Sequence, residues 1–236
     1  MLEASAEKKG ERVRHPDGEP ESLFERFPWL YAFCRDHLFR DDTEKIAASL
    51  WPAGGPTEGE RLLELGCGPG FYARRLGEAF GHLDVTGVDR SASQLRRARM
   101  LAAAGSLDNC SFEKGDARAL SAPDASFDAV VISRLFVIMS EPERVISEAH
   151  RVLKPGGRLF VAEPRATLRA AVPLAAMRLL AGFEALFAGR VRDYREPDGV
   201  CVLTGAEFCD VVGSRGWRAV RCWQDLWYQY AVCEKR

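Results

Sequence analysis

The fold is decided by the stretch Leu62-Leu63-Glu64-Leu65-Gly66-Cys67-Gly68-Pro69-Gly70. An apolar run followed by glycines at alternate positions predicts a buried strand that enters a tight turn before a helix. Glycine tolerates positive φ angles and lets a ligand approach the backbone closely. We therefore expect the turn to present bare backbone N–H groups at a helix N-terminus, where an anionic ligand group is favoured.

A second strand carries the complementary signal. It is predicted over 83–88 and is followed directly by Asp89. Ligands of open α/β sheets bind at the carboxyl ends of the strands, and a carboxylate there can accept both hydroxyls of a ribose. The alternative interpretation of Asp89 is an acid that favours the N-terminus of the following helix. The turn and the acid together indicate a nucleoside-containing cofactor.

The spacing of the glycines distinguishes between the classes of nucleoside cofactor. The dinucleotide fingerprint places a third glycine three residues after the second, but Phe71 occupies that position counted from Gly68. The row Glu-x-Gly-x-Gly-x-Gly instead resembles motif I of the class I S-adenosylmethionine-dependent methyltransferases. The resemblance extends in register through four further blocks, at 88–91, 115–117, 127–131 and 151–159. It implies S-adenosylmethionine as cofactor and S-adenosylhomocysteine as product.

Two other functions remain open. A nicotinamide-dependent oxidoreductase also uses a glycine turn and a ribose-binding acid, although Phe71 disfavours it. A regulatory or scaffold protein could bind the cofactor without turnover, because no general-base pair is evident.

The remaining pattern predicts an α/β fold. Strands are expected at 61–65, 83–88, 109–113, 127–132 and 157–162, alternating with helices at 70–80, 91–103 and 141–152. Such alternation predicts a parallel sheet with right-handed crossovers. A capping box at Thr204 begins a helix to Gly213, followed by strands near 217–223 and 226–233. The resemblance implies a Rossmann-like, mostly parallel sheet of seven strands, with helices on both faces and an antiparallel last strand.

Three regions are expected along the chain. Residues 1–20 are charged and poor in apolar residues, which predicts a disordered tail. Residues 21–56 are expected to form an N-terminal helical lid, rich in aromatic residues, and a linker. The methyltransferase domain then covers 57–236, with a helical cap inserted at about 165–200.

The inserted segment is both basic and apolar. The segment from Arg165 to Arg195 contains six arginines, and its only acids are Glu184 and Asp193, so its net charge is +4. A basic amphipathic helix can lie on anionic lipid or hold an anionic, hydrophobic acceptor. We favour the alternative, a lid helix whose arginines face water, and keep peripheral membrane contact open.

Composition excludes several classes. The 236 residues carry a formal charge of −1, which argues against a nucleic-acid-binding protein. Seven singly scattered cysteines fit reduced thiols in the cytoplasm, and the four histidines lack the spacing of metal ligands, so no metal is expected. No signal peptide and no membrane span are evident. We therefore expect a cytoplasmic protein of unknown oligomeric state.

The resemblance assigns cofactor contacts residue by residue. The motif turn would bind the methionine carboxylate, Glu64 the ammonium group and Asp89 the ribose. Asp116 would accept from the adenine amino group. The full set of expected cofactor-binding residues is Glu64, Gly66, Cys67, Gly68, Gly70, Asp89, Arg90, Asp116, Ala117 and Ser133. A surface acid at Glu64 and a plain turn aspartate at Asp116 are the alternatives, and Cys67 is expected to pack rather than attack.

No residue is identified as a catalytic base. Attack on a sulfonium carbon mainly requires that the nucleophile be held in line with it. The residues expected to contact the acceptor are Tyr31, Arg134, Phe136 and Tyr194, with Met139, Glu163, Arg165 and Tyr228 as further options. The layout resembles quinone-biosynthesis and phospholipid methyltransferases. It implies a small apolar or aromatic acceptor, lipid-like, quinone-like or a natural product, methylated at O, N or C.

Overall fold

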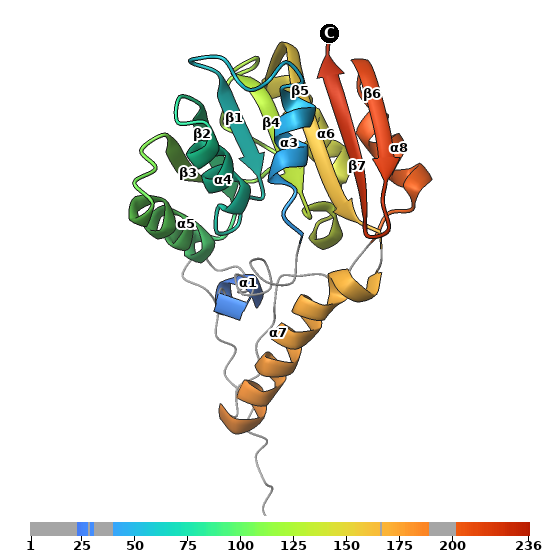
Figure 1. Ribbon diagram of the computed structural model, residues 1–236. Coiled ribbons are helices and arrows are strands. Elements are labelled where there is room, and N and C mark those ends of the chain that lie inside the picture. Colours follow the sequence, from blue (N-terminus) through green and yellow to red (C-terminus); the bar gives the residue numbers. More distant parts are fainter. Residues whose placement is uncertain (1–22, 28, 31–39, 166, 189–201) are drawn as a thin grey trace, which may run out of the picture.

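A computed structural model shows a seven-stranded sheet covered by helices on both faces (Figure 1). The structure describes residues 23–27, 29–30, 40–165, 167–188 and 202–236. The tail 1–20, Tyr31 and Tyr194 lie outside the described residues. The strands are β1 (Arg61–Leu65), β2 (Asp84–Asp89), β3 (Cys110–Lys114), β4 (Phe127–Ser133), β5 (Leu153–Pro164), β6 (Trp217–Gln224) and β7 (Tyr228–Lys235).

The strand order β3-β2-β1-β4-β5-β7-β6 locates the ligand crevice. β3, β2, β1, β4 and β5 are parallel, whereas β7 is antiparallel to both β5 and β6. The chain proceeds outward from β1 through β2 to β3, then returns to β4 on the other side of β1. Ligands of open α/β sheets bind where the strand order reverses in this way. The expected Rossmann-like sheet with an antiparallel last strand is confirmed.

Helices pack on each face of the sheet. One face is covered by α3 (Thr43–Leu50), α4 (Phe71–Ala79) and α5 (Ala92–Ala104), and the other by α6 (Pro142–Val152) and α8 (Gly205–Gly213). Alternate residues of β1 serve the two layers, because side chains of a strand point to opposite faces. Leu62 packs in the first layer, and Leu63 and Leu65 pack in the second.

The sequence-based elements agree with these bounds except at β5. The strand begins at Leu153, four residues before the expected start, because Leu153 pairs with Phe127 ahead of an irregularity in register. The expected capping box of α8 is present: Thr204 accepts the N–H of Glu207, whose side chain accepts from Thr204. Ser91 likewise caps α5 through the N–H of Gln94.

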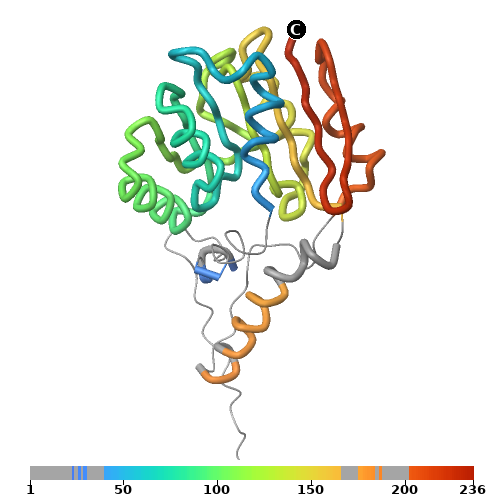
Figure 2. Tube along the Cα trace, viewed as in Figure 1, coloured from blue at the N-terminus to red at the C-terminus, as the bar shows by residue number. Residues whose placement is uncertain are grey.

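A helical unit lies beyond the carboxyl ends of the parallel strands (Figure 2). It consists of α1 (Leu23–Arg26) and α7 (Thr167–Ala188), the latter within the expected cap insertion. Leu23 and Phe27 pack against Met177 and Ala181, and all four are buried. Within the described ranges, no helix combines the length and apolar character needed to span a bilayer.

Candidate cofactor and acceptor site

The turn between β1 and α4 requires its glycines. Gly66, Gly68 and Gly70 have φ angles of 68°, 52° and 70°, a region that other residues adopt only at a steric cost. A Cβ on Gly66 would lie 2.7 Å from Leu135 Cδ1, and a Cβ on Gly70 would lie 2.5 Å from Phe112 Cε1. Backbone conformation and close packing therefore both demand glycine.

The N–H groups of this turn are not bare, and that expectation is wrong. Gly66 and Cys67 donate to the Val88 carbonyl at 2.8 and 3.1 Å, and Gly70 donates to the Cys67 carbonyl at 2.9 Å. The Gly68 N–H donates to Asp89 Oδ2 at 2.8 Å. These bonds fasten the turn onto the end of β2. Its contribution to a ligand site is therefore space rather than free donors.

The contacts of Asp89 bear on both interpretations made from the sequence, ribose binding and stabilisation of a helix N-terminus. Its Oδ1 accepts the N–H of Ser91, the N-cap of α5, at 2.8 Å, while Oδ2 accepts the N–H of Gly68. A carboxylate oxygen can accept more than one hydrogen bond. The carboxylate is thus preorganised at the end of β2, where a vicinal diol could be held.

Glu64 is a buried acid rather than a surface acid. Only 4% of the residue is exposed, and Oε2 accepts the Ala73 N–H at 2.8 Å in the first turn of α4. Burial of a carboxylate is costly unless it is paired or hydrogen-bonded. The position of Glu64 beside the turn is compatible with the expected ammonium contact.

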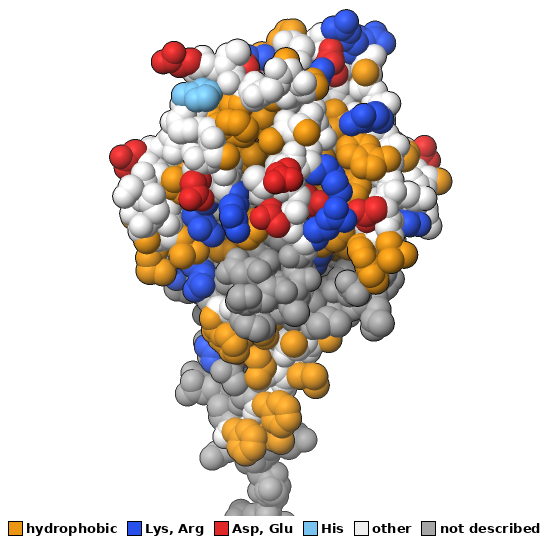
Figure 3. Space-filling view, in the orientation of Figure 1, with side chains coloured by type: hydrophobic (Ala, Val, Ile, Leu, Met, Phe, Trp, Pro, Cys, Tyr) orange, Lys and Arg blue, Asp and Glu red, His pale blue; other side chains and the backbone are white. Residues whose placement is uncertain are grey.

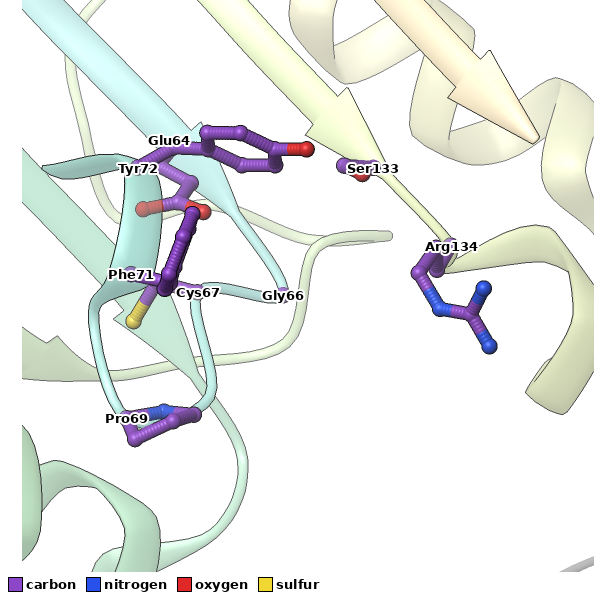
Figure 4. Close-up of a pocket in the computed structure, with 8 residues that line it drawn as sticks. All are labelled: Glu64, Gly66, Cys67, Pro69, Phe71, Tyr72, Ser133 and Arg134. Atoms are coloured by element: carbon purple, nitrogen blue, oxygen red, sulfur yellow. The ribbon is translucent and has the colours of Figure 1, made fainter. Parts of the chain in front are cut away.

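A cavity opens between the motif turn, the start of α4 and the end of β4 (Figure 4). The empty space between its lining residues is about 270 Å³ and includes open solvent, so this is a shallow, open hollow. Its lining residues are Glu64, Gly66, Cys67, Pro69, Phe71, Tyr72, Ser133 and Arg134. Phe71 and Tyr72 were missed as site residues, although aromatic residues directly after the glycine turn were a visible signal. Aromatic faces beside a carboxylate suit a cationic ligand group.

Cys67 is not set up as a nucleophile. Burial, followed by the nearby charges of Asp89 and Glu64, raises the pKa of the Cys67 thiol well above its usual range. The thiolate is the reactive form of cysteine. The packing role expected for Cys67 agrees with this.

The expected adenine contact lies after β3 and has a partner that the sequence analysis missed. Arg118 Nη2 donates to Asp116 Oδ2 at 2.7 Å, and Nε donates to Oδ1 at 3.0 Å. This bidentate contact lowers the pKa of Asp116 to about 2. Arg90 Nε lies 3.9 Å from the same carboxylate, and Ala117 is buried beside it. Asp116 is therefore a fixed, ionised acceptor.

The loop after β4 brings Arg134 to the cavity but not Phe136. Arg134 has a φ angle of 58°, and its Nη1 donates to the Tyr228 hydroxyl at 2.7 Å. Phe136 begins the short 3-10 helix η1 (Phe136–Ile138) and is buried in the core on the α6 face. Phe136 therefore packs in the core in this structure, and its acceptor contact stays a prediction.

Glu163, near the end of β5, anchors this loop through hydrogen bonds. Its Oε1 accepts the N–H groups of Leu135 and Phe136 at 2.8 and 3.0 Å. Its Oε2 is buried and has no hydrogen-bond partner among the residues that the structure describes. Burial is the main cause that raises the pKa of Glu163 to about 7. Glu163 thus fixes the loop that carries Arg134.

Comparison with known proteins also indicates a methyltransferase. A methyltransferase domain model matches residues 62–157. Phosphatidylethanolamine N-methyltransferase of Cereibacter sphaeroides is 39% identical over 161 residues, which cover 66% of this chain and 72% of that protein. Demethylmenaquinone methyltransferase of Clavibacter sepedonicus is 32% identical over 163 residues, covering 69% and 62%. The 27-O-demethylrifamycin SV methyltransferase of Amycolatopsis mediterranei is 42% identical over 106 residues, covering 44% and 39%.

A solved structure shares the fold. The [4+2]-cyclase SpnF matches with a TM-score of 0.66 at 20% identity, and the match covers 97% of this chain and 99% of that one. At this identity the likeness shows the fold alone. The chain spans less than two thirds of the Clavibacter and Amycolatopsis relatives, but more than two thirds of the Cereibacter relative.

The sheet defines a Rossmann-like fold whose strand order reverses between β1 and β4, the position at which such folds bind nucleoside ligands. The chain belongs to the class I S-adenosylmethionine-dependent methyltransferases. Its cofactor is S-adenosylmethionine, and the residues present fit that molecule. Gly66 lines the cavity, and the carboxylates of Glu64 and Asp89 are held beside the same turn by backbone N–H groups.

Proposed function

We propose that this protein transfers a methyl group from S-adenosylmethionine to a small apolar or aromatic acceptor, either lipid- or quinone-like or a natural product. The observation that carries the proposal is the cavity, which extends from the glycine turn to Ser133 and Arg134, where the acceptor is expected to bind. The relatives act, by their names, on phosphatidylethanolamine, demethylmenaquinone and a demethylrifamycin. These acceptors share a large apolar part.

The residues proposed to contact the cofactor lie near the ends of different strands, and each is proposed to contact a different part of the cofactor. When bound, S-adenosylmethionine supplies an electrophilic methyl carbon on a sulfonium. Asp89 would accept the ribose hydroxyls and Asp116 the adenine amino group. Glu64 would face the ammonium group, and Ser133 would border the reacting methyl. Each of the three acids is already held by hydrogen bonds, which reduces the ordering needed on binding.

The cavity supports catalysis by positioning. Its ionisable side chains are otherwise engaged: Glu64 caps α4, Arg134 donates to Tyr228, and Cys67 stays a thiol. Holding the acceptor in line with the methyl carbon can lower a barrier by roughly 7–11 kcal/mol in favourable cases. Arg134 would orient the acceptor through an oxygen, because its guanidinium is a fixed multiple donor.

The test uses S-adenosylmethionine labelled in its methyl group. The full chain is incubated with phosphatidylethanolamine vesicles, demethylmenaquinone in detergent or 27-O-demethylrifamycin SV, and the label in each organic extract is counted. We expect label to enter at least one acceptor, and Arg134→Leu to reduce the transfer rate at least tenfold. Binding of S-adenosylhomocysteine without transfer to any of the three would contradict the proposal and favour a protein without turnover.

The chain offers a matched control for the Arg134 variant. Arg144 is an arginine on α6, where it pairs with Glu141 at 3.2 Å outside the cavity. Arg144→Leu removes the same charge and should leave the transfer rate unchanged. Equal losses in the two variants would show that Arg134 does not act in the acceptor site.

A further inference from the structure

Helix α7 carries an apolar face that points to solvent. The face is formed by residues 58–84% exposed, namely Leu179, Phe183, Leu186 and Phe187. Their spacing of four, seven and eight residues from the first places them on one side of a helix. The other side of α7 is occupied, since Met177 and Ala181 are buried against α1. We call this exposed set the apolar face of α7.

A second exposed apolar surface lies at the start of the same helix. Leu226 and Trp227, in the turn between β6 and β7, are both exposed. Arg165, two residues before α7, donates its N–H to the Trp227 carbonyl at 2.9 Å and its Nη1 to the Asp225 carbonyl at 2.6 Å. Apolar side chains are visible along the narrow lower part of the molecule that contains α7 (Figure 3). Exposed apolar surface formed by several large side chains marks an interaction site.

The apolar face lies on the functional side of the protein. α7 follows β5 directly, beyond the carboxyl ends of the parallel strands (Figure 1). The cavity opens at the same ends, next to Ser133 at the end of β4. α7 as a whole therefore lies at the end of the sheet at which the cavity opens, while its apolar face is in its C-terminal half, which points away from the sheet (Figure 1).

Charge distinguishes among the possible partners. Residues 165–188, which comprise α7 and the two residues before it, contain three arginines and Glu184 as their only acid, a net charge of +2 in a chain whose formal charge is −1. Positive charge is thus concentrated in the segment that carries the apolar face. An anionic bilayer interface is complementary to both properties, because acyl chains accept the apolar side chains and headgroups attract the arginines. A second copy of the chain would match the apolar side chains but not the excess charge.

We propose that the apolar face of α7 docks into the interface of an anionic lipid bilayer, with α7 lying on the membrane. Docking would turn the carboxyl ends of the parallel strands, and with them the cavity, toward the membrane from which an apolar acceptor could come. This last consequence rests on the proposed function, whereas the docking itself does not.

The test is flotation of the full chain with lipid vesicles. Vesicles of phosphatidylcholine alone are compared with vesicles that contain an equal part of phosphatidylglycerol. We expect binding to the mixed vesicles that is at least tenfold tighter than to phosphatidylcholine and that weakens with added salt. Replacing Phe183 and Phe187 together by Asp should reduce binding at least tenfold, with S-adenosylhomocysteine affinity and Tm unchanged.

A matched control comes from another helix, α5. Met100 on α5 is 61% exposed and lies outside the apolar face, so Met100→Asp should bind vesicles as the unmodified chain does. Unmodified protein that stays unbound, or a double variant that binds fully, would overturn the proposal. A dimer in solution that the double variant converts to a monomer would also overturn it, in favour of a second copy. Because no methyl acceptor is needed, failure of methyl transfer leaves the vesicle result intact.

Discussion

Asp89 Oδ2 accepts the backbone N–H of Gly68 at 2.8 Å, so the acid after β2 and the glycine turn after β1 form one unit. The two sequence motifs are therefore coupled physically. A change in the acid alters the shape of the turn, and the turn orients the acid toward the proposed ribose position.

Asp89→Ala is predicted to weaken S-adenosylhomocysteine binding at least tenfold. Hydrogen bonds to charged groups contribute about 1.5–3 kcal/mol each, and about 1.4 kcal/mol corresponds to a tenfold change in affinity. The variant should also lose about 1–3 kcal/mol of stability, because the N–H groups of Gly68 and Ser91 lose their acceptor. Isothermal titration calorimetry and urea unfolding measure the two effects.

Asp84→Ala is the matched control for this prediction. Asp84 is the first residue of the same strand, is exposed, and lies at the opposite end from Asp89. Its removal should leave S-adenosylhomocysteine affinity unchanged. Similar affinities in the two variants would exclude Asp89 from the cofactor site.

Gly70→Ala is predicted to destabilise the fold more than Gly59→Ala. Both glycines have positive φ angles, of 70° and 80°, so alanine is strained at either position. An added Cβ at Gly59 meets nothing within 4 Å, whereas at Gly70 it would contact the Phe112 ring. The difference in unfolding free energy should be about 1–3 kcal/mol, the usual cost of overpacking. Equal losses in urea unfolding would show that the turn can shift away from Phe112.

Asp116→Ala is predicted to change the selectivity for the base. An ionised acceptor favours adenine, whose amino group donates, over hypoxanthine, which presents an oxygen there. We expect S-adenosylhomocysteine affinity to fall about tenfold, near the 1.5–3 kcal/mol of a charged hydrogen bond. S-inosylhomocysteine should bind no more weakly than before. Parallel losses for both ligands, measured by calorimetry, would place Asp116 outside the base site.

Glu163→Gln is predicted to change the pH dependence of stability. Burial raises the pKa of Glu163 from 4.5 to about 7, so the folded protein favours the protonated acid. The resulting stability is fully present below pH 4.5 and is lost as pH rises through 7. Glutamine does not titrate. As pH rises from 5 to 8, the stability of the variant relative to the unmodified protein should therefore increase by on the order of 2 kcal/mol.

Urea unfolding at both pH values measures this difference. Gln229 is a suitable control site, because it lies opposite Glu163 on β7 and is equally buried. Gln229→Leu should show a stability difference that does not change with pH. If the stability difference between Glu163→Gln and the unmodified protein also does not change with pH, Glu163 does not titrate in this range.

Local signals in the sequence were sufficient to predict the strands, the helices and the glycine turn, and the resemblance added several residues of the cavity. Glycine spacing identifies the turn at Gly66, because the backbone conformation there excludes other residues. Alternating apolar runs and the caps at Ser91 and Thr204 mark the elements, since each depends on residues a few positions apart. The resemblance added the strand order, which no local pattern contains.

Features that depend on distant contacts could not be predicted. Phe136 lies in the apolar run 135–138, in which spacing does not show which side chains turn inward. The partners of the turn N–H groups come from β2, and Glu163 reaches its partners only after β4 and β5 pair. Burial of Glu64 likewise arises from α4 folding back over β1.

The most direct test of the central claim is a calorimetric titration of the full chain with S-adenosylhomocysteine and, separately, with NAD. We expect saturable binding of S-adenosylhomocysteine at one site per chain and no heat with NAD, because Phe71 replaces the third glycine of a dinucleotide turn. Binding of NAD without binding of S-adenosylhomocysteine would contradict the methyltransferase assignment.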